Sequence, residues 1–126
     1  MQEYILEKND FLVSQTDEKG NIIFANDDFC RIAGFSIDEL IGKPHNIVRH
    51  KDMPKAAFKM LWDTVKEGKI WNGYVKNRTK DGGYYWVYAT VYPSKNANGE
   101  RGYMSCRRKP SAQEIEDAQA LYETLR

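Results

Sequence analysis

The hydrophobic residues near the start of the chain form two short β-prone runs, and those that follow recur at helical spacing. Residues 11–16 (FLVSQT) and 21–24 (NIIF) are separated by the turn-forming sequence DEKG. Two runs of this kind around such a turn predict a β-hairpin. Asn26 then precedes two aspartates and Gly34 closes the run, which predicts a short helix over 27–33 with Asn26 as its N-cap.

Two further helices are predicted before residue 68. Ser36 and Glu39 have the spacing of a capping box, in which each side chain bonds the backbone amide of the other residue, and about one helical turn follows. Asp52 is placed to cap a longer helix that tolerates Pro54 in its first turn. Positions that recur at intervals of three and four predict the buried face of this helix: Met53, Ala56, Ala57, Met60, Leu61, Thr64 and Val65.

The period changes to two from Trp71, which predicts a strand over 71–80. Odd-numbered residues from Trp71 to Thr79, Asn77 among them, point inward, and even-numbered ones point to solvent. A DGG turn leads to a second strand over 84–92 that ends at Pro93, and a third strand is expected over about 102–108. Strands that follow helices indicate an α+β domain, in which the first hairpin completes a five-stranded antiparallel sheet with the helices on one face.

A flanking C-terminal helix is expected after Pro110, with Ser111 and Glu114 as a second capping box. Its apolar positions form a narrow stripe: Ile115, Ala118, Leu121, Tyr122 and Leu125. We expect this stripe to cover the outward side of the strand over 84–92, within one chain or across a dimer. The predicted organisation is an N-terminal segment over 1–10, a core domain over 11–109 and a linker helix over 110–126.

Length and charge limit the classes of function. The chain has 126 residues, and its 19 basic and 18 acidic side chains leave a net charge of +1, so we expect one domain without a general preference for nucleic acid or anionic membranes. No apolar run approaches the roughly 18 residues of a membrane span, and the N-terminus does not resemble a signal peptide, so a cytoplasmic location is expected. Cys30 and Cys106 lack metal or redox spacing and are expected to pack as small hydrophobes.

Both histidines of the chain lie in one short connection, residues 42–54, which reads GKPHNIVRHKDMP. This connection carries five polar candidates for a site: His45, Arg49, His50, Lys51 and Asp52. Amides at the start of the following helix, together with the two basic side chains, would form an anion site suited to a pyrophosphate or to ring carbonyls. A solvated basic loop, in which the aspartate serves only as a helix cap, is the alternative interpretation.

The order of elements and several sequence phrases resemble the PAS sensor domain. The general phrases are DEKGNIIFAN at 17–26, GFSIDELIGK at 34–43 and KNRTKDGGYYWV at 76–87. Two more particular phrases, PHNIVRHKDMPKAAF at 44–58 and WNG at 71–73, are similar to the N-terminal flavin-binding PAS domain of bacterial aerotaxis receptors. The resemblance implies a PAS fold, a non-covalently bound FAD, and a redox state that is reported to a signalling domain or chemotaxis partner.

Several residues fit such a site by their own chemistry. Asn77 would present a buried carboxamide that needs hydrogen-bond partners. A flavin ring, which offers a donor between two acceptors, could bond this carboxamide. Backbone groups at the end of the hairpin are the alternative partners. Trp71 could lie against the ring, as the resemblance implies for its W-x-G setting, or close the edge of the core. Arg107 would face inward if no bulge intervenes and would answer the charge of a reduced ring. The PAS resemblance also places Asn26 and Phe29 beside this pocket, with a plain N-cap as the alternative for Asn26.

Other cofactors and other classes of protein fit the sequence less well. Light-sensing flavin domains that form a cysteinyl adduct need a thiol, which the segment 44–50 lacks. His45 or His50 could serve as an axial haem ligand, but haem-binding PAS domains usually take that ligand from or near the long helix, which has no histidine. No catalytic pair stands at motif spacing, so no enzyme and no metal site is expected. The main alternative is a cofactor-free PAS module that dimerises or binds partners through its sheet face and terminal helices.

Overall fold

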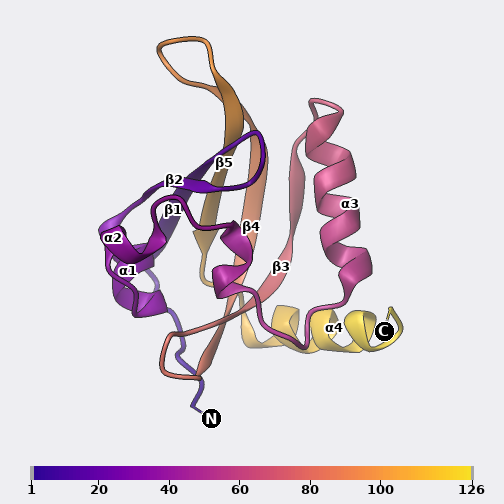
Figure 1. Cartoon of the computed structure of the whole chain (residues 1–126). Coiled ribbons are helices and arrows are strands. Elements are labelled where there is room, and N and C mark those ends of the chain that lie inside the picture. The colour runs from indigo at the N-terminus through magenta and orange to yellow at the C-terminus, as the bar shows by residue number, and fades with distance from the viewer. Residues whose placement is uncertain (1, 126) are drawn as a thin grey trace.

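The computed structural model describes residues 2–125, and these form a five-stranded antiparallel sheet with helices on both faces (Figure 1). In chain order the elements are β1 (Phe11–Asp17), β2 (Ile22–Ala25), α1 (Asp27–Ala33), α2 (Ile37–Leu40), the 3₁₀ helix η1 (His45–Val48), α3 (Lys55–Lys66), β3 (Trp71–Arg78), β4 (Tyr84–Lys95), β5 (Arg101–Arg108) and α4 (Ala112–Glu123). The strand order is β2-β1-β5-β4-β3. The α+β class and the five antiparallel strands predicted from the sequence are therefore confirmed.

The register of the central strands decides which side chains face the helices. β1 and β5 pair without interruption, and Ser14 lies opposite Ser105. Leu12, Ser14 and Thr16 are buried while their neighbours are more exposed, so one face of the sheet looks toward α1, η1 and α3. Because strand residues alternate between faces, Arg107 of β5 points to this inner side, as predicted.

A single core fills the space between the inner face of the sheet and the helices that cover it. Phe29 of α1, Leu40 of α2, Val48 of η1 and Val65 of α3 are each at most 1% exposed. These four side chains come from four different elements and meet inward-facing strand residues such as Val87. Burial of this apolar surface fixes the helices relative to the sheet, because each large aliphatic or aromatic side chain contributes roughly 1.5–3 kcal/mol when buried.

Local capping signals correctly predicted where three helices begin. Asn26 caps α1, and complete capping boxes open α2 at Ser36 and α4 at Ser111. The prediction that Asp52 caps the long helix is wrong, because α3 begins after Pro54, which makes no side-chain cap bond. A residue that precedes proline is driven out of helical conformation, so Met53 cannot form the first turn and the aspartate is left outside the helix.

Two predictions about exposure and strand length also need correction. Met60 was expected on the buried face of α3, but it is 58% exposed. Pro93 was expected to end its strand, but β4 continues to Lys95 and Pro93 pairs with Tyr103 of β5. The last β3 partner of β4 is Val91, so beyond that residue β4 has a neighbour on one side only, and a proline without an N–H group is tolerated at such an edge.

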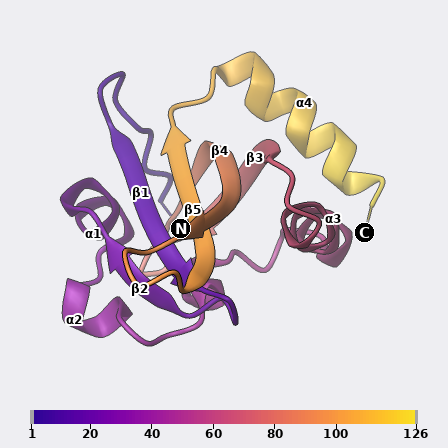
Figure 2. The same cartoon turned by 90° about the horizontal axis from the view of Figure 1, so that it is seen from above.

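Helix α4 covers part of the outer face of the sheet (Figure 2). The ring of Tyr122 stacks on Trp86 of β4 at 6.4 Å between centroids. The hydroxyl of Tyr122 donates to the backbone carbonyl of Tyr74, and the Tyr74 hydroxyl donates to Glu114. The prediction that the even-numbered side of β3 is solvated is therefore wrong at Tyr74, because α4 of the same chain packs against it.

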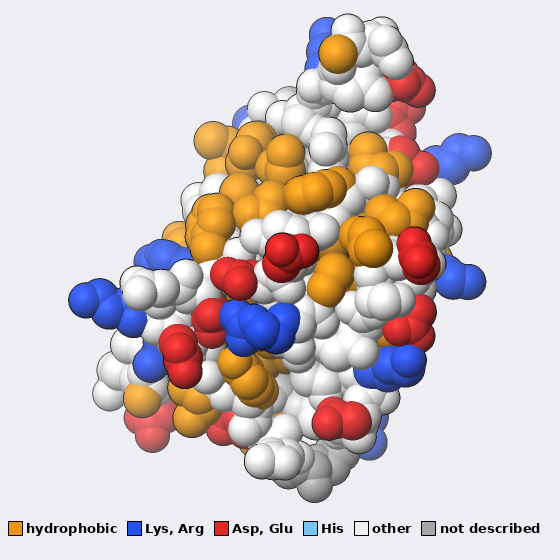
Figure 3. Space-filling model, turned by 90° about the vertical axis from the view of Figure 1, so that its left-hand side faces the viewer, with side chains coloured by type: hydrophobic (Ala, Val, Ile, Leu, Met, Phe, Trp, Pro, Cys, Tyr) orange, Lys and Arg blue, Asp and Glu red, His pale blue; other side chains and the backbone are white. Residues whose placement is uncertain are grey.

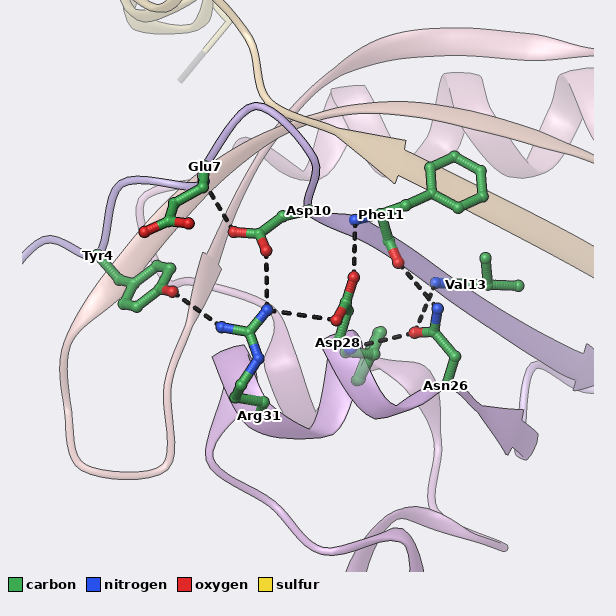
Figure 4. Close-up of polar contacts among 9 residues, drawn as sticks. Tyr4, Glu7, Asp10, Phe11, Val13, Asn26, Asp28 and Arg31 are labelled. Carbon is green, nitrogen blue, oxygen red and sulfur yellow. Dashed lines mark hydrogen bonds and ion pairs between the residues drawn. The ribbon is translucent and has the colours of Figure 1, made fainter.

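The N-terminal segment is fastened to α1 by a cluster of polar contacts (Figure 4). Arg31 of α1 forms ion pairs with Asp10 at 2.8 Å and Asp28 at 3.3 Å, and it also donates to the hydroxyl of Tyr4. Asp10 is buried, whereas Arg31 is half-exposed. The segment continues to β4, where the Tyr4 amide donates to the carbonyl of Tyr84. These contacts order the chain ahead of β1.

Within residues 2–125, no helix combines enough length with enough apolar character to span a bilayer.

Candidate functional site

A cavity of about 450 Å³ lies between the inner face of the sheet, helix α3, the 3₁₀ helix η1 and the β1–β2 turn. Four of the residues predicted for a cofactor site line it: His45, Arg49, Asn77 and Arg107. This volume falls within the range of roughly 300–1,000 Å³ that is usual for small-molecule sites in proteins. Four polar residues that the sequence singled out therefore lie together in the lining of this cavity.

Arg107 forms the polar centre of one wall. Its Nη2 atom donates to Ser14 Oγ at 3.0 Å and to His45 Nε2 at 2.8 Å, and its guanidinium carbon lies 5.2 Å from the centroid of the Phe29 ring. Burial lowers the pKa of Arg107 to about 10. The side chain therefore keeps its positive charge at neutral pH inside the protein.

The partners of His45 fix its protonation state. An arginine side chain can only donate, so the Nε2 atom that faces Arg107 must accept, and the ring is neutral with its proton on Nδ1. Ser14 Oγ lies 2.9 Å from the same Nε2 atom. Burial first and the neighbouring guanidinium second lower the pKa of His45 to about 3. His45 thus enters the cavity wall as a neutral acceptor.

Arg49 and Asn77 meet across the edge of the sheet. Their backbones form an isolated antiparallel bridge, which places the end of η1 beside β3. The Asn77 side chain is 3% exposed and lies opposite Tyr85 of β4, and the Arg49 guanidinium lies over the ring of Phe58 at 4.0 Å. The carboxamide and the guanidinium therefore lie in neighbouring parts of one cavity.

His50 and Asp52 do not line this cavity. His50 is 5% exposed and packs edge-on against Tyr84 at 6.0 Å, while Asp52 accepts from Lys76 Nζ at 2.9 Å. Both side chains belong to a cluster at the β3 edge. The connection that holds both histidines contains the 3₁₀ helix η1, and His50 is buried, so the interpretation of a wholly solvated loop does not apply to it.

The remaining predicted residues, Asn26, Phe29 and Trp71, are not among the residues that line the cavity. Asn26 Oδ1 accepts from the amides of Phe29 at 3.0 Å and Val13 at 3.1 Å, and its Nδ2 donates to the Phe11 carbonyl (Figure 4). Asn26 therefore acts as an N-cap that also ties α1 to β1. Phe29 is fully buried and supports the His45 ring edge-on at 5.9 Å. Trp71 is half-buried at the start of β3, on the same side as Val91, which does line the cavity.

Residues that sequence reasoning missed complete the lining. Trp62 of α3 and Tyr103 of β5 pack edge-on at 5.3 Å and form an aromatic part of the wall. Thr16 and Ser105 add hydroxyl groups. Alternation along β1 and β5 was a usable signal for three of these, because Thr16 shares the inward side with Ser14, and Tyr103 and Ser105 share it with Arg107.

The cavity contains buried polar atoms that are suited to a ligand. Among residues 2–125, Thr16 Oγ1, Ser105 Oγ and Arg107 Nη1 are buried without a hydrogen-bond partner, and all three residues line the cavity. Buried polar groups of native proteins are normally satisfied, because an unmet one costs about 1–3 kcal/mol. Donors, hydroxyls and aromatic rings around one space fit a flat heterocycle with carbonyl groups along its edge.

The fold agrees with the comparison to known families. The chain matches the PAS fold family over residues 22–107 and belongs to that family. It is 46% identical to the aerotaxis receptor of Escherichia coli K12 over 114 residues, which are 90% of this chain and 22% of the receptor. It is 31% identical to the nitrogen fixation regulatory protein of Klebsiella oxytoca over 96 residues, 76% of this chain and 19% of that protein.

These curated relatives are receptors and regulators, and the chain spans only about a fifth of their length. Among solved structures, one described as "Flavin Analogue Sheds Light on Light-Oxygen-Voltage Domain Mechanism" superposes with a TM-score of 0.72 at 17% identity, over 92% of this chain and 87% of that chain. At this identity the superposition shows a common fold.

Proposed function

We propose that this PAS domain binds FAD non-covalently and senses redox or oxygen state for a larger signalling protein of the aerotaxis or energy-taxis type. The observation that carries the proposal is the cavity of about 450 Å³, with a buried guanidinium, a buried carboxamide and unpartnered hydroxyls in its lining. The similarity to an aerotaxis receptor over 90% of the chain supports the sensory role. The cytoplasm is the location we predict for this domain.

Each proposed contact uses a side chain whose chemistry suits one part of the cofactor. Asn77, with two donors and one acceptor, suits the ring edge that alternates carbonyl and N–H groups. Trp62 and Tyr103 offer aromatic surface to the ring. Arg49 and the basic residues before α3 suit the pyrophosphate. A bound flavin supplies electron storage, and the protein has only to hold it and to change hydrogen bonds with it, so no catalytic group is required.

Three of the predicted site residues, Trp71, His50 and Asp52, do not line the cavity but remain part of this proposal. Trp71 lies beside the cavity-lining part of the sheet, and we propose that it closes the space over a bound ring. His50 and Asp52 hold the strand edge that carries Asn77, through Tyr84 and Lys76. We propose that these two residues affect FAD binding by positioning this edge.

Neither haem ligation nor adduct photochemistry fits this lining as well. The Nε2 atom of His45, which would have to bind iron, already accepts from Arg107 at 2.8 Å. His50 Nδ1 accepts from the Asp52 amide at 3.0 Å and the ring lies outside the cavity. Neither of the chain's cysteines, Cys30 and Cys106, is among the described residues that line the space. A flavin held by non-covalent contacts is the cofactor that uses the observed groups.

The outer face of the sheet is the surface that we propose for a signalling partner or a second copy. α4 covers the β3 and β4 side, whereas Phe11, Ile23 and Phe24 on β1 and β2 are each between 45% and 49% exposed. Figure 3 shows hydrophobic side chains gathered in the upper part of one side of the molecule, above a region where acidic and basic side chains mix. Apolar groups gathered in this way are common at protein interfaces.

Absorption spectroscopy tests the cofactor directly. Protein purified without added flavin is expected to be yellow, to bleach with dithionite and to release FAD on denaturation. Asn77→Ala should weaken FAD binding by about tenfold, because one or more hydrogen bonds of about 1–1.5 kcal/mol are lost. The matched control is Asn72→Ala on the same strand, since Asn72 is exposed on the outer face.

The outcomes of this experiment separate the two main interpretations. Colourless protein that fails to take up FAD would refute the sensor and favour a cofactor-free interaction module. A Soret band would replace the flavin with haem. Equal FAD content in the Asn77 and Asn72 variants would show that the ring lies elsewhere.

A further inference from the structure

One end of the cavity borders solvent where helix α3 faces the β1–β2 turn. Glu18 and Lys19 of the turn and Lys66 of α3 line this end, and all three residues are exposed. The half-buried indole of Trp62 on α3 also lines the cavity and reaches toward the turn. The contacts of this indole therefore decide how well this end of the cavity is closed.

Trp62 joins α3 to two other elements. Its Cη2 and Cζ2 atoms lie 3.3 Å from the position that a Cβ atom on Gly20 would occupy. Gly20 has a φ of 86° and no side chain, so the indole can approach the backbone of the turn closely. The same ring packs edge-on against Tyr103 of β5, with 5.3 Å between the ring centroids. One side chain therefore links the helix to the turn and to the sheet.

No polar bond reinforces this contact between the helix and the turn. Within residues 2–125, no hydrogen bond or ion pair joins α3 to the β1–β2 turn. The turn is bonded to the connection before η1 instead, where the Gly20 carbonyl accepts from the His45 amide at 3.0 Å. Segments that share few contacts separate locally at a small cost in free energy. The indole can therefore leave the turn without breaking a hydrogen bond between the two elements.

We propose that Trp62 is a gate residue, which controls how readily solvent and dissolved oxidants reach a ligand in this cavity. Where that ligand is a flavin, the inference rests on the proposed function. A reduced flavin gives two electrons to dioxygen, which takes up two protons from the ring and from water and leaves as hydrogen peroxide. A side chain that keeps dioxygen and water away from the ring slows this reaction without taking part in it. Trp62 thus sets the rate at which the reduced domain is oxidised again.

The test is the rate at which air-saturated buffer oxidises the reduced, flavin-loaded protein in a stopped-flow instrument, with protein in excess so that no free flavin contributes. Trp62→Ala should raise this rate by about three- to tenfold, because an aromatic pair favours its closed arrangement by about that factor. Trp62→Phe keeps part of the contact and should react at an intermediate rate. Met60→Ala is the matched control, because Met60 is exposed on the same helix and does not line the cavity. Equal rates for the two alanine variants would overturn the inference.

A second measurement decides the inference independently of flavin. If the purified chain binds no flavin, the proposed function fails, and the gate is then tested on the unliganded chain with anilinonaphthalene sulfonate, a dye that fluoresces in apolar surroundings. Trp62→Ala should take up this dye about three- to tenfold faster than Met60→Ala, for the same reason. Circular dichroism shows whether each variant is folded, and Trp62→Phe takes the place of the alanine variant if that one is not. Equal rates of dye uptake in folded variants would overturn the inference.

Discussion

Replacement of His45 by glutamine should remove a specific part of the acid sensitivity of this domain. His45 titrates near 6.5 in an unfolded chain, and burial together with Arg107 lowers its pKa to about 3 in the folded protein. Between these values the unfolded state binds a proton that the folded state does not. Stability from this group is therefore complete above about pH 6.5 and is lost as the pH falls.

The size of this pH effect follows from the difference in proton binding between the folded and unfolded states. Between these two pKa values, each unit of decrease in pH lowers the free energy of unfolding by about 1.4 kcal/mol. The loss from pH 6.5 to 4.5 is therefore at most about 3 kcal/mol. The value is an upper limit because His45 as a residue is half-buried, so solvent screens part of the effect. A domain of 126 residues typically has about 6–19 kcal/mol of stability, so the change is measurable.

Urea unfolding followed by circular dichroism at several pH values measures this contribution. The amide oxygen of His45→Gln can accept from Arg107 and does not titrate, so the free-energy difference between the unmodified protein and the variant should shift by about 2–3 kcal/mol from pH 7 to pH 4.5. A difference that stays constant across this range would refute the assignment of a neutral, buried imidazole.

Three further substitutions test the structure around the site. Asn26→Ala should lower the free energy of unfolding by about 2 kcal/mol in urea, because a helix cap and two contacts to β1 are lost together, whereas a loss under about 0.5 kcal/mol would contradict this role. Tyr122→Ala should release α4 from Trp86 and speed its proteolysis while the sheet stays folded; unchanged protease resistance would mean that other contacts hold the helix. Gly102→Ala places a Cβ atom 2.1 Å from the carbonyl oxygen of Thr16, so a loss of about 2–3 kcal/mol is expected, and a fully stable variant would contradict this close approach.

Local sequence signals predicted the fold where a few adjacent residues decide the outcome. The capping boxes at Ser36 and Ser111 are complete within four positions, and the structure confirms both. The errors in where helices and strands begin or end fall at two prolines. Helix α3 begins only after Pro54. Strand β4 continues through Pro93 because β3 does not extend beside that residue. The second outcome depends on strand pairing, which nearby residues do not reveal.

The candidate site was predictable to the extent that strand alternation governs it. Period-two spacing placed Asn77 and Arg107 inward, and both line the cavity. The same spacing does not govern the connection before α3, where η1 turns the backbone so that Arg49 lines the cavity and His50 does not. Trp62 lies at the margin of the buried face of α3, so the helical spacing did not single it out. It belongs to the cavity wall because Tyr103 of β5 packs against it, a contact that the sequence does not reveal.

Strand β3 borders the cavity with one side and packs against the C-terminal helix with the other. Asn77 faces the cavity, and Tyr74, three residues earlier, bonds both Glu114 and Tyr122 of α4. Three residues of strand span only about 10 Å. As the outermost strand next to β4, β3 is held by a ladder on one side and by the short Arg49 bridge on the other. A twist of this strand on ligand binding would therefore reach α4 through rigid backbone, without any rearrangement of the central sheet.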